Sequence, residues 1–534
     1  EDQKNYILQL NEIRNDIQSN STIASIRYSI DTSDEYYEEE KKYWDEYMPL
    51  YEDLNCEFYK AIVNSQFKNE IINDFSKQFY NICEDSIKSF SKEIIEDLQE
   101  ENKLCSQYTK LLASAKIEYK GETHNLSSLM KYMMDKDIET RIESTKLYYS
   151  YFEENEDKFD SLFDKLVSVR DKMAKKLGYK SFTELGYIRM NRSDYNEENI
   201  KKLREEVQDY IVPLCNKLYE RQAKRIGIDD FWFAHESIEF KNGNATIKGG
   251  EEYEKYIIEN GKKMYSELSK ETAEFFEYMT QNELMDLVTR KSKAAGGYCT
   301  HIPNYNSPFI FSNFNNTSED IDVLTHEAGH AFQLYMSKDI PMYEINFPTL
   351  DSCEIHSMSM EFITYPWMEL FFKEDTLKYK FYHMSSAIKF IPYGVIVDEF
   401  QHRIYENPTM SKDERKQIFR ELEKKYLPHR DYRDIDILEK GGYWFKQGHI
   451  FKNPFYYIDY VLAQLCAFQF LQKSNENFEQ AWQDYINICK VGGTKSFLEI
   501  VNIGNLNSPF EDKTIKNIGE NINNLLVNIK DSEL

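Results

Sequence analysis

The chain has 534 residues, of which 66 are Lys or Arg and 92 are Asp or Glu, so its net charge is −26 with histidine neutral. This acidic balance argues against a protein that binds nucleic acid through phosphate attraction. Hydrophobic residues make up 41% of the sequence, against only 19 Gly and 12 Pro, which leaves enough apolar surface for a large core and excludes a wholly disordered chain.

Neither a secretory leader nor a membrane-spanning segment is visible in the sequence. The N-terminal stretch is strongly charged, and no apolar run approaches the roughly eighteen residues that a transmembrane helix needs. The 8 cysteines lie at long, irregular intervals without a C-x-x-C pair, which is typical of buried thiols in a reducing compartment. The sequence therefore predicts a cytoplasmic protein without a disulfide framework and without a membrane partner.

The N-terminal third, residues 3–186, alternates charged with aromatic or aliphatic residues at three- and four-residue steps. This spacing predicts amphipathic helices, with breaks at the small polar clusters 29–34 and 121–124. We expect residues 1–190 to form a helical lobe without catalytic side chains. A second helical stretch is predicted over 197–225.

Strand-like sequence follows this second helical stretch. The pieces 237–240 and 245–248 flank Asn242-Gly243-Asn244, a turn sequence that is typical of a β-hairpin. Two further strands are expected at 296–300 and 309–314, on either side of a turn rich in Pro and Asn. Helical periodicity then continues to the C-terminus, so the sequence predicts a mainly α fold with one small β-sheet.

The motif H-E-A-G-H at 326–330 lies inside a helix predicted for 318–338, which opens with the capping sequence T-S-E-D and ends before a proline. Residues four apart share one helix face, so His326 and His330 can present two imidazoles to one cation. Neutral imidazole is a good zinc ligand. Glu327 can then act as the general base toward the attacking water. The motif predicts a metal centre.

Zinc needs a third protein ligand, and the next helix, predicted for 352–372, offers carboxylates. Glu354 and Glu361 lie on one face of this helix two turns apart, so one can bind the metal while the other orients a metal ligand. Glu354 also fits a helix-capping pattern. Spacing alone therefore leaves Glu354 open against Glu361, Asp351 and Glu344.

The H-E-A-G-H motif and the segment C-E-I-H-S-M-S-M-E at 353–361 resemble the zinc oligopeptidases of the thimet oligopeptidase/neurolysin (M3) family, in particular its oligoendopeptidase F branch. In that family the first Glu of the second motif is the third zinc ligand, which the resemblance assigns to Glu354. The resemblance also implies a zincin-like fold in which two helical lobes flank a deep substrate channel. The lobe 1–190 would then precede a catalytic region, 191–534, whose small sheet lies within about 231–314 beside the metal helix.

His449 and the segment P-F-Y-Y-I-D-Y at 454–460 resemble the C-terminal motif of this family, whose His and Tyr side chains donate to the scissile carbonyl. Such donors stabilise the negative charge that develops on the carbonyl oxygen during attack. The resemblance points to His449, Tyr457 and Tyr460. The spacing from His449 to the tyrosines is one residue shorter than in the mammalian members, so the individual roles of Tyr456, Tyr457 and Tyr460 stay open.

Gly296-Gly297-Tyr298-Cys299 and P-F-I-F-S-N-F at 308–314 are also similar to segments of the oligoendopeptidase F branch. There they would supply the sheet edge along which an extended peptide lies, because an edge strand offers unpaired N–H and C=O groups. The alternative is a buried hairpin whose glycines serve only a bend. His356 is not expected to bind the metal itself; at most it could contact a metal ligand and hold it in position. A structural role is expected for the remaining histidines, which are His124, His235, His301, His383, His402 and His429.

We therefore expect a cytoplasmic zinc metalloendopeptidase that binds one Zn²⁺ and hydrolyses internal bonds of short, unstructured oligopeptides. These substrates are its expected partners, and neither nucleic acid nor a membrane is expected to bind. One alternative is a helical H-E-x-x-H metallocarboxypeptidase, which would need a positive group to receive the carboxylate of the substrate. The other alternative is a peptide-binding protein without turnover, and the intact Glu327 argues against it.

Overall fold

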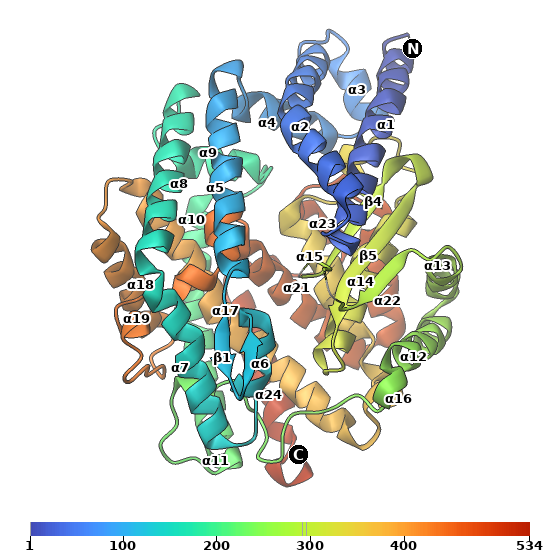
Figure 1. The fold of residues 1–534 in the computed structure, drawn as a ribbon. Helices are drawn as coiled ribbons and strands as arrows, with labels where there is room; N and C mark the ends of the chain where they lie inside the picture. The colour runs from blue at the N-terminus through green and yellow to red at the C-terminus, as the bar shows by residue number, and fades with distance from the viewer. Residues whose placement is uncertain (1, 291, 295) are drawn as a thin grey trace.

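The computed structural model describes residues 2–290, 292–294 and 296–534. It is mainly helical, as predicted, with two small sheets among the described residues (Figure 1). Its first part contains α1 (Asp2–Ile30), α2 (Glu35–Val63), α3 (Lys68–Asp74), α4 (Lys77–Ser89), α5 (Ile95–Ala113), β1 (Ile117–Tyr119), β2 (Glu122–His124), α6 (Leu126–Met133), α7 (Ile138–Glu154), α8 (Glu156–Lys176), α9 (Phe182–Arg189), α10 (Glu197–Glu206), α11 (Val212–Ile226), α12 (Tyr253–Leu268) and α13 (Lys270–Gln281). The rest contains β3 (Met285–Val288), β4 (Tyr298–Ile302), β5 (Ser307–Phe314), α14 (Glu319–Met336), α15 (Leu350–Ile363), α16 (Glu369–Phe372), α17 (Thr376–Glu406), α18 (Lys412–Tyr426), α19 (Asp436–Glu439), α20 (Gly448–Lys452), α21 (Tyr457–Glu476), α22 (Phe478–Val491), α23 (Phe497–Ile503) and α24 (Thr514–Asn528).

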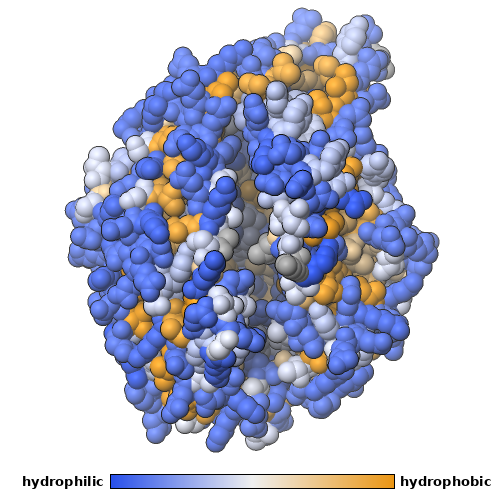
Figure 2. Space-filling model, in the orientation of Figure 1, coloured by the Kyte–Doolittle hydropathy of each residue, from blue (hydrophilic) through white to orange (hydrophobic). Residues whose placement is uncertain are grey.

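Two groups of elements face each other across the middle of the molecule. Helices α5, α7 and α8 stand on one side, and α1, α2 and the strands β4 and β5 stand on the other (Figure 1). Helix α17 contacts α8, α9 and α21, and α21 packs along α15, so these helices join the two sides. The surface between the two groups is hollowed (Figure 2).

The eight cysteines are all free thiols, and six of them are buried. This agrees with the prediction of buried thiols rather than a disulfide framework. Among the described helices, none combines the length and the apolar character needed to cross a membrane.

The predicted N-terminal helices are present, and α1 and α2 are separated at residues 31–34 as expected. The second expected break is a short antiparallel hairpin of β1 and β2 rather than a simple loop. Lys120 and Gly121 connect the two strands with φ angles of 51° and 82°. Positive φ at both positions is what a two-residue type I′ turn needs, so this turn produces a hairpin within a helical region.

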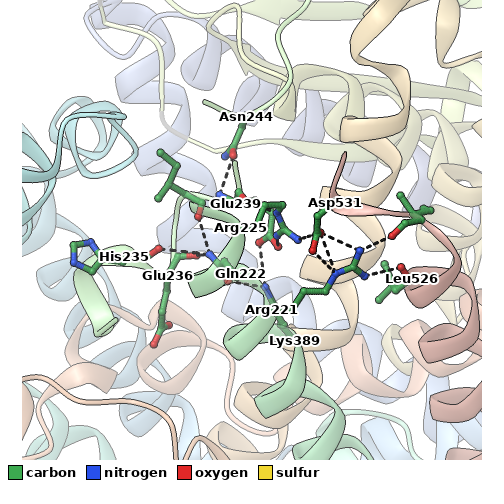
Figure 3. Close-up of polar contacts among 12 residues, drawn as sticks. Arg221, Gln222, Arg225, His235, Glu236, Glu239, Asn244, Lys389, Leu526 and Asp531 are labelled. Carbon is green, nitrogen blue, oxygen red and sulfur yellow. Dashed lines mark hydrogen bonds and ion pairs between the residues drawn. The ribbon is translucent and has the colours of Figure 1, made fainter. Parts of the chain in front are cut away.

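The predicted hairpin at 237–248 is wrong, because this segment forms no strand. Its backbone groups are instead bonded to side chains (Figure 3). The Glu239 N–H donates to Asn244 Oδ1 at 3.0 Å, and the buried Gln222 of α11 donates to the Ile238 carbonyl at 2.8 Å. Because buried backbone groups need only some partner, these side chains make a paired strand unnecessary.

The three-stranded sheet has the order β3-β5-β4, with β5 parallel to β3 and antiparallel to β4. The two strands predicted at 296–300 and 309–314 are thus confirmed as β4 and β5, while β3 was not predicted. Ile26 of α1 packs on Phe309 and Phe311 on one face of β5, and Ile310 on the other face joins the main core. Among the described residues, the outer edge of β4 makes no backbone hydrogen bond to another segment.

The predicted metal helix is α14, and its N-terminus is capped differently from the prediction. Neither Thr317 nor Ser318 caps it through its side chain; the Asp320 carboxylate instead accepts the backbone N–H groups of Asn315 and Asn316 at 3.0 and 2.8 Å. The following helix, α15, ends at Ile363 rather than continuing to 372. A 3₁₀ turn with a proline separates it from α16, because proline cannot continue the helical hydrogen bonds.

Helices α14 and α15 cross closely at Gly329. A Cβ atom at this position would lie 2.7 Å from Ser357 Cα and 2.8 Å from the His356 carbonyl oxygen. Both atoms belong to the backbone of α15 and cannot rotate away. The absence of a side chain at Gly329 therefore lets α15 approach the metal helix.

We expect Gly329→Ala to lower the free energy of unfolding by about 2 kcal/mol, because the added methyl group must push the two helices apart. Urea denaturation followed by circular dichroism measures the change. Gly504→Ala is the matched control, since its Cβ would have its nearest neighbours, all side-chain atoms, at 3.4 Å. Equal stability of the two variants would contradict the close-crossing argument.

Candidate metal centre and active site

Three side chains from α14 and α15 converge on one point. His326 Nε2 lies 3.1 Å and His330 Nε2 lies 3.2 Å from the same oxygen of Glu354, Oε2. Ligand atoms about 2.0–2.1 Å from a tetrahedral zinc ion lie about 3.3 Å from one another. The two distances to Glu354 match this spacing, and the ligand atoms of all three residues lie within 4.8 Å of one another. Glu354 is not a helix cap, because the N-cap position of α15 is Thr349.

The contact between His326 and Glu361 orients the imidazole toward the point of convergence. Its Nδ1 lies 2.7 Å from Glu361 Oε1, so the ring carries a proton on the side away from Glu354. Its Nε2 then turns a lone pair toward the Glu354 oxygen when the imidazole is neutral. In this neutral form the imidazole and the carboxylate are both oriented to bind a positive ion placed between them. Glu354 of α15 thus faces both histidines, while Glu361 of the same helix bonds to the other nitrogen of His326.

Glu361 is also bonded to His383, a histidine for which only a structural role was expected. His383 of α17 lies with its Nε2 2.7 Å from Glu361 Oε2, and its Nδ1 is 2.7 Å from the Tyr365 hydroxyl. Both oxygens of Glu361 are thus fixed by histidines. His383 follows Glu361 by 22 positions on a different helix, so no local spacing in the sequence connects the two residues.

Glu327 lies beside the three converging side chains without being one of them. It is 7% exposed, and its Oε2 has no hydrogen-bond partner among the described residues. Burial raises the pKa of this carboxyl, although His326 and His330 oppose the change. A buried carboxylate with a raised pKa and a free oxygen is suited to accept a proton.

The pKa of the Glu354 carboxyl is shifted in the opposite direction from that of Glu327. Burial would raise the pKa of the Glu354 carboxyl, but the two histidines outweigh it and hold this pKa well below its usual value. The Tyr456 hydroxyl donates to Glu354 Oε1 at 2.7 Å, and the Ser357 hydroxyl donates to Oε2 at 2.7 Å. Glu354 is therefore ionised and held in place. Tyr456 acts on this candidate ligand, which the sequence motif did not reveal.

His449, Tyr457 and Tyr460 are brought together on the other side of the centre. The ring of His449 lies 4.9 Å from that of Tyr457 and 5.7 Å from that of Tyr460. Burial lowers the pKa of His449 to about 4, with a contribution from Lys452, and burial raises the pKa of both tyrosines. All three side chains are neutral near pH 7 and can donate hydrogen bonds.

Gln447 sets the tautomer of His449. The Tyr393 hydroxyl donates to Gln447 Oε1 at 2.9 Å, and Gln447 Nε2 lies 2.8 Å from His449 Nδ1. The amide thus donates to Nδ1 and leaves the imidazole proton on Nε2. Sequence reasoning missed Gln447, which stands two positions before His449 in the same turn.

Other histidines form hydrogen bonds with backbone carbonyls or with side chains that are not candidate metal ligands. His356 is fully buried, and its ring nitrogens lie 3.2 Å from the Ser352 carbonyl and 3.3 Å from the Ile488 carbonyl. His402 contacts Tyr187, and His235 contacts Arg141. His356 therefore does not support a metal ligand.

Two cavities adjoin the converging side chains. The first, of about 430 Å³, is lined by Gly297, Val323, His326 and Glu327 among others. The second, of about 420 Å³, lies against α17 and α21, and Asp322 and Glu361 line both cavities. Gly296 and Gly297, which directly precede β4, line the first cavity together with the end of β5.

Comparisons with known proteins agree with this geometry. Residues 1–90 match the model of the peptidase M3 N-terminal domain, and residues 259–520 match the model of peptidase family M3. An oligoendopeptidase F homologue of Borreliella burgdorferi is 23% identical over 457 residues, which cover 81% of this chain and 74% of the relative.

Solved structures are similar over nearly the whole chain. PZ peptidase A, solved with an inhibitor, is 50% identical with a TM-score of 0.95, and the match covers 99% of this chain and 94% of that one. A candidate oligoendopeptidase F of Bacillus anthracis is 49% identical with a TM-score of 0.91, and the match covers 100% and 93% of the two chains.

Proposed function

The chain belongs to peptidase family M3, as an oligoendopeptidase F, and from that membership we propose that it is a zinc-dependent endopeptidase of short, unstructured peptides. The proposal rests above all on the convergence of His326, His330 and Glu354 beside a buried carboxyl group with a free oxygen. We also propose that it acts in the cytoplasm, and that residues 1–190 and 191–534 are its two functional regions.

His326, His330 and Glu354 would hold one zinc ion. Bound there, zinc supplies Lewis-acid chemistry, which polarises a carbonyl group and lowers the pKa of a water molecule. Cobalt or manganese could occupy the same donor set.

Glu327 would accept the proton of the attacking water and pass it to the nitrogen of the leaving amine. Its raised pKa suits both steps, because the group must bind the proton and then release it. His449, with its proton on Nε2, would donate to the carbonyl oxygen of the scissile bond together with Tyr457 and Tyr460. The free edge of β4 would bind the peptide backbone in extended form.

The test is cleavage of an end-blocked, internally quenched oligopeptide by the purified protein, before and after chelation and with zinc restored. We expect internal cleavage that chelation abolishes and zinc recovers, with product masses that locate the cleaved bond. Loss of a terminal residue from free-ended peptides only would favour the carboxypeptidase instead. Binding of the peptide without turnover of either kind would favour the peptide-binding protein.

The substrate size follows from the same geometry. His330 and Glu354 are buried and His326 is only partly exposed, so a folded protein could not bring a backbone segment to the candidate centre. A stably folded protein should therefore survive under conditions in which a short peptide is cleaved, as gel electrophoresis can show. Equal rates for both would contradict restriction to oligopeptides.

A further inference from the structure

The turn that leads into α21 has a backbone conformation that its residue rarely adopts. Phe455, which directly precedes Tyr456 and Tyr457, has a φ of 68°. A bulky side chain disfavours this left-handed region, so the conformation persists only where surrounding contacts hold it. The turn therefore needs support from the rest of the fold, and it directly adjoins the tyrosines of the candidate site.

Both backbone polar groups of Phe455 are held by side chains from distant parts of the chain. Its N–H donates to Gln401 Oε1 of α17 at 2.9 Å, and its carbonyl accepts a hydrogen bond from Arg192 Nη2. The same nitrogen of Arg192 donates to Asp459 Oδ1 at 2.7 Å. Arg192 thus binds the chain on both sides of residues 456–458.

The guanidinium group of Arg192 is itself fixed in place. Arg192 follows α9, its side chain is fully buried, and its guanidinium carbon lies 4.5 Å from the ring centroid of Tyr187. The ring of Phe455 packs against the same segment, because a Cβ atom on Gly186 would collide with it. Residues 186–192 therefore hold both the backbone and the ring of Phe455.

Stability alone does not explain a guanidinium group at this position. Among the described residues, Nε and Nη1 of Arg192 have no hydrogen-bond partner, although the side chain is buried. Buried N–H groups without partners destabilise a fold, and an apolar side chain of similar volume often stabilises such a position as well or better. The two bonds of Nη2 are therefore the feature that only this side chain supplies.

From these contacts we propose that Arg192 is a positioning residue of the candidate site. It holds the turn at Phe455 and thereby fixes Tyr456, whose hydroxyl donates to Glu354, and Tyr460, which follows in the first turn of α21. This inference rests on the proposed function and deepens it. It makes the placement of both tyrosines depend on a residue outside the two cavities that adjoin the centre.

The experiment compares Arg192→Met with the unaltered, zinc-loaded protein on the end-blocked, internally quenched peptide. Methionine has an unbranched side chain but cannot donate a hydrogen bond. Burial raises the pKa of Asp459, so this carboxyl can take up a proton once the guanidinium group is gone. We expect kcat to fall about 10- to 100-fold at saturating zinc, with KM changed by less than about threefold.

Arg141→Met is the matched control. Arg141 is also buried and also donates to a backbone carbonyl, at 2.6 Å, but to none in the segment 455–460. Its loss removes a buried guanidinium group without releasing the turn at Phe455, so kcat should stay within about threefold of the unaltered protein.

Double-mutant cycles separate positioning from general destabilisation. In the Tyr460→Phe background, Arg192→Met should lower kcat by less than about threefold, because the hydroxyl that it displaces is already absent. Zinc affinity, measured by competition with a chelating indicator, should fall about tenfold in Arg192→Met, but by less than about threefold when Tyr456→Phe is already present. Losses of the same size in every background would overturn the inference.

A second variant keeps the test open if thermal melting shows that Arg192→Met does not fold. Asp459→Asn retains an oxygen that can accept from Arg192 and leaves the bond to Phe455 intact. Its loss of kcat should therefore be smaller, about threefold to tenfold, and Tyr460→Phe should again remove it. Unchanged kcat and zinc affinity in the folded variant would overturn the inference.

The zinc measurement keeps this inference distinct from the proposed function. If the unaltered protein cleaves no peptide but Tyr456→Phe removes the effect of Arg192→Met on zinc affinity, the proposed function fails and the positioning role stands. If peptides are cleaved while the effects of the variants on kcat and on zinc affinity are independent of one another, the positioning role fails and the proposed function stands.

Discussion

Glu327→Gln protein is expected to bind one equivalent of zinc and to lose about 10³-fold or more of its kcat on a blocked peptide. Glutamine has nearly the same shape as glutamate but cannot accept the proton of the attacking water. Zinc should remain because Glu327 is not one of the converging ligands. Initial rates with the quenched peptide and metal analysis of the same sample measure the two effects.

The size of this loss follows from the surroundings of Glu327. Its Oε2 is buried without a hydrogen-bond partner among the described residues, so this oxygen is not engaged by another side chain. Glu361 also lines the first cavity, but His326 and His383 hold both of its oxygens. Glu274→Gln, an exposed change on α13, is the matched control and should leave kcat within about threefold. Undiminished activity of Glu327→Gln would refute its role as the base.

The sequence predicted the parts of the site that depend on local helix geometry. His326 and His330 share a face because they are four residues apart, and Glu354 and Glu361 share a face because they are seven apart. Spacing did not decide which of these carboxylates meets the histidines. That choice depends on how α15 crosses α14 at Gly329, which is tertiary packing, and the family resemblance supplied it at the sequence level.

The contacts that the sequence did not predict come from elements distant along the chain or from side chains that replace backbone pairing. His383 reaches Glu361 from α17, and Tyr456 reaches Glu354 from 102 positions away. The turn sequence at 242–244 is typical of a β-hairpin. However, the side chains of Gln222 and Asn244 bond to backbone groups that would pair with each other in a hairpin. Strand β3 is four residues long, too short for its alternation to be recognised.

Tyr456→Phe and Tyr460→Phe are expected to have different effects, and their comparison assigns the two hydroxyls. Tyr456 donates to Glu354, so its loss should weaken zinc binding by about 10- to 100-fold. Activity should then largely return at saturating zinc. Tyr460 lines the cavity against α17 and α21 near His449, and its hydroxyl is proposed to donate to the scissile carbonyl. Tyr460→Phe should lower kcat by about 10²- to 10³-fold without changing zinc affinity.

Added zinc should restore the activity of Tyr456→Phe but not that of Tyr460→Phe. Zinc affinity is measured by competition with a chelating indicator, and kcat is measured at zinc concentrations above saturation for each variant. The elevated pKa of the Tyr460 hydroxyl, caused mainly by burial, keeps it protonated at neutral pH and therefore able to donate. If Tyr456→Phe loses kcat that zinc does not restore while Tyr460→Phe is nearly unaffected, the assignments are reversed, and Tyr456 is the donor to the carbonyl oxygen despite its bond to Glu354.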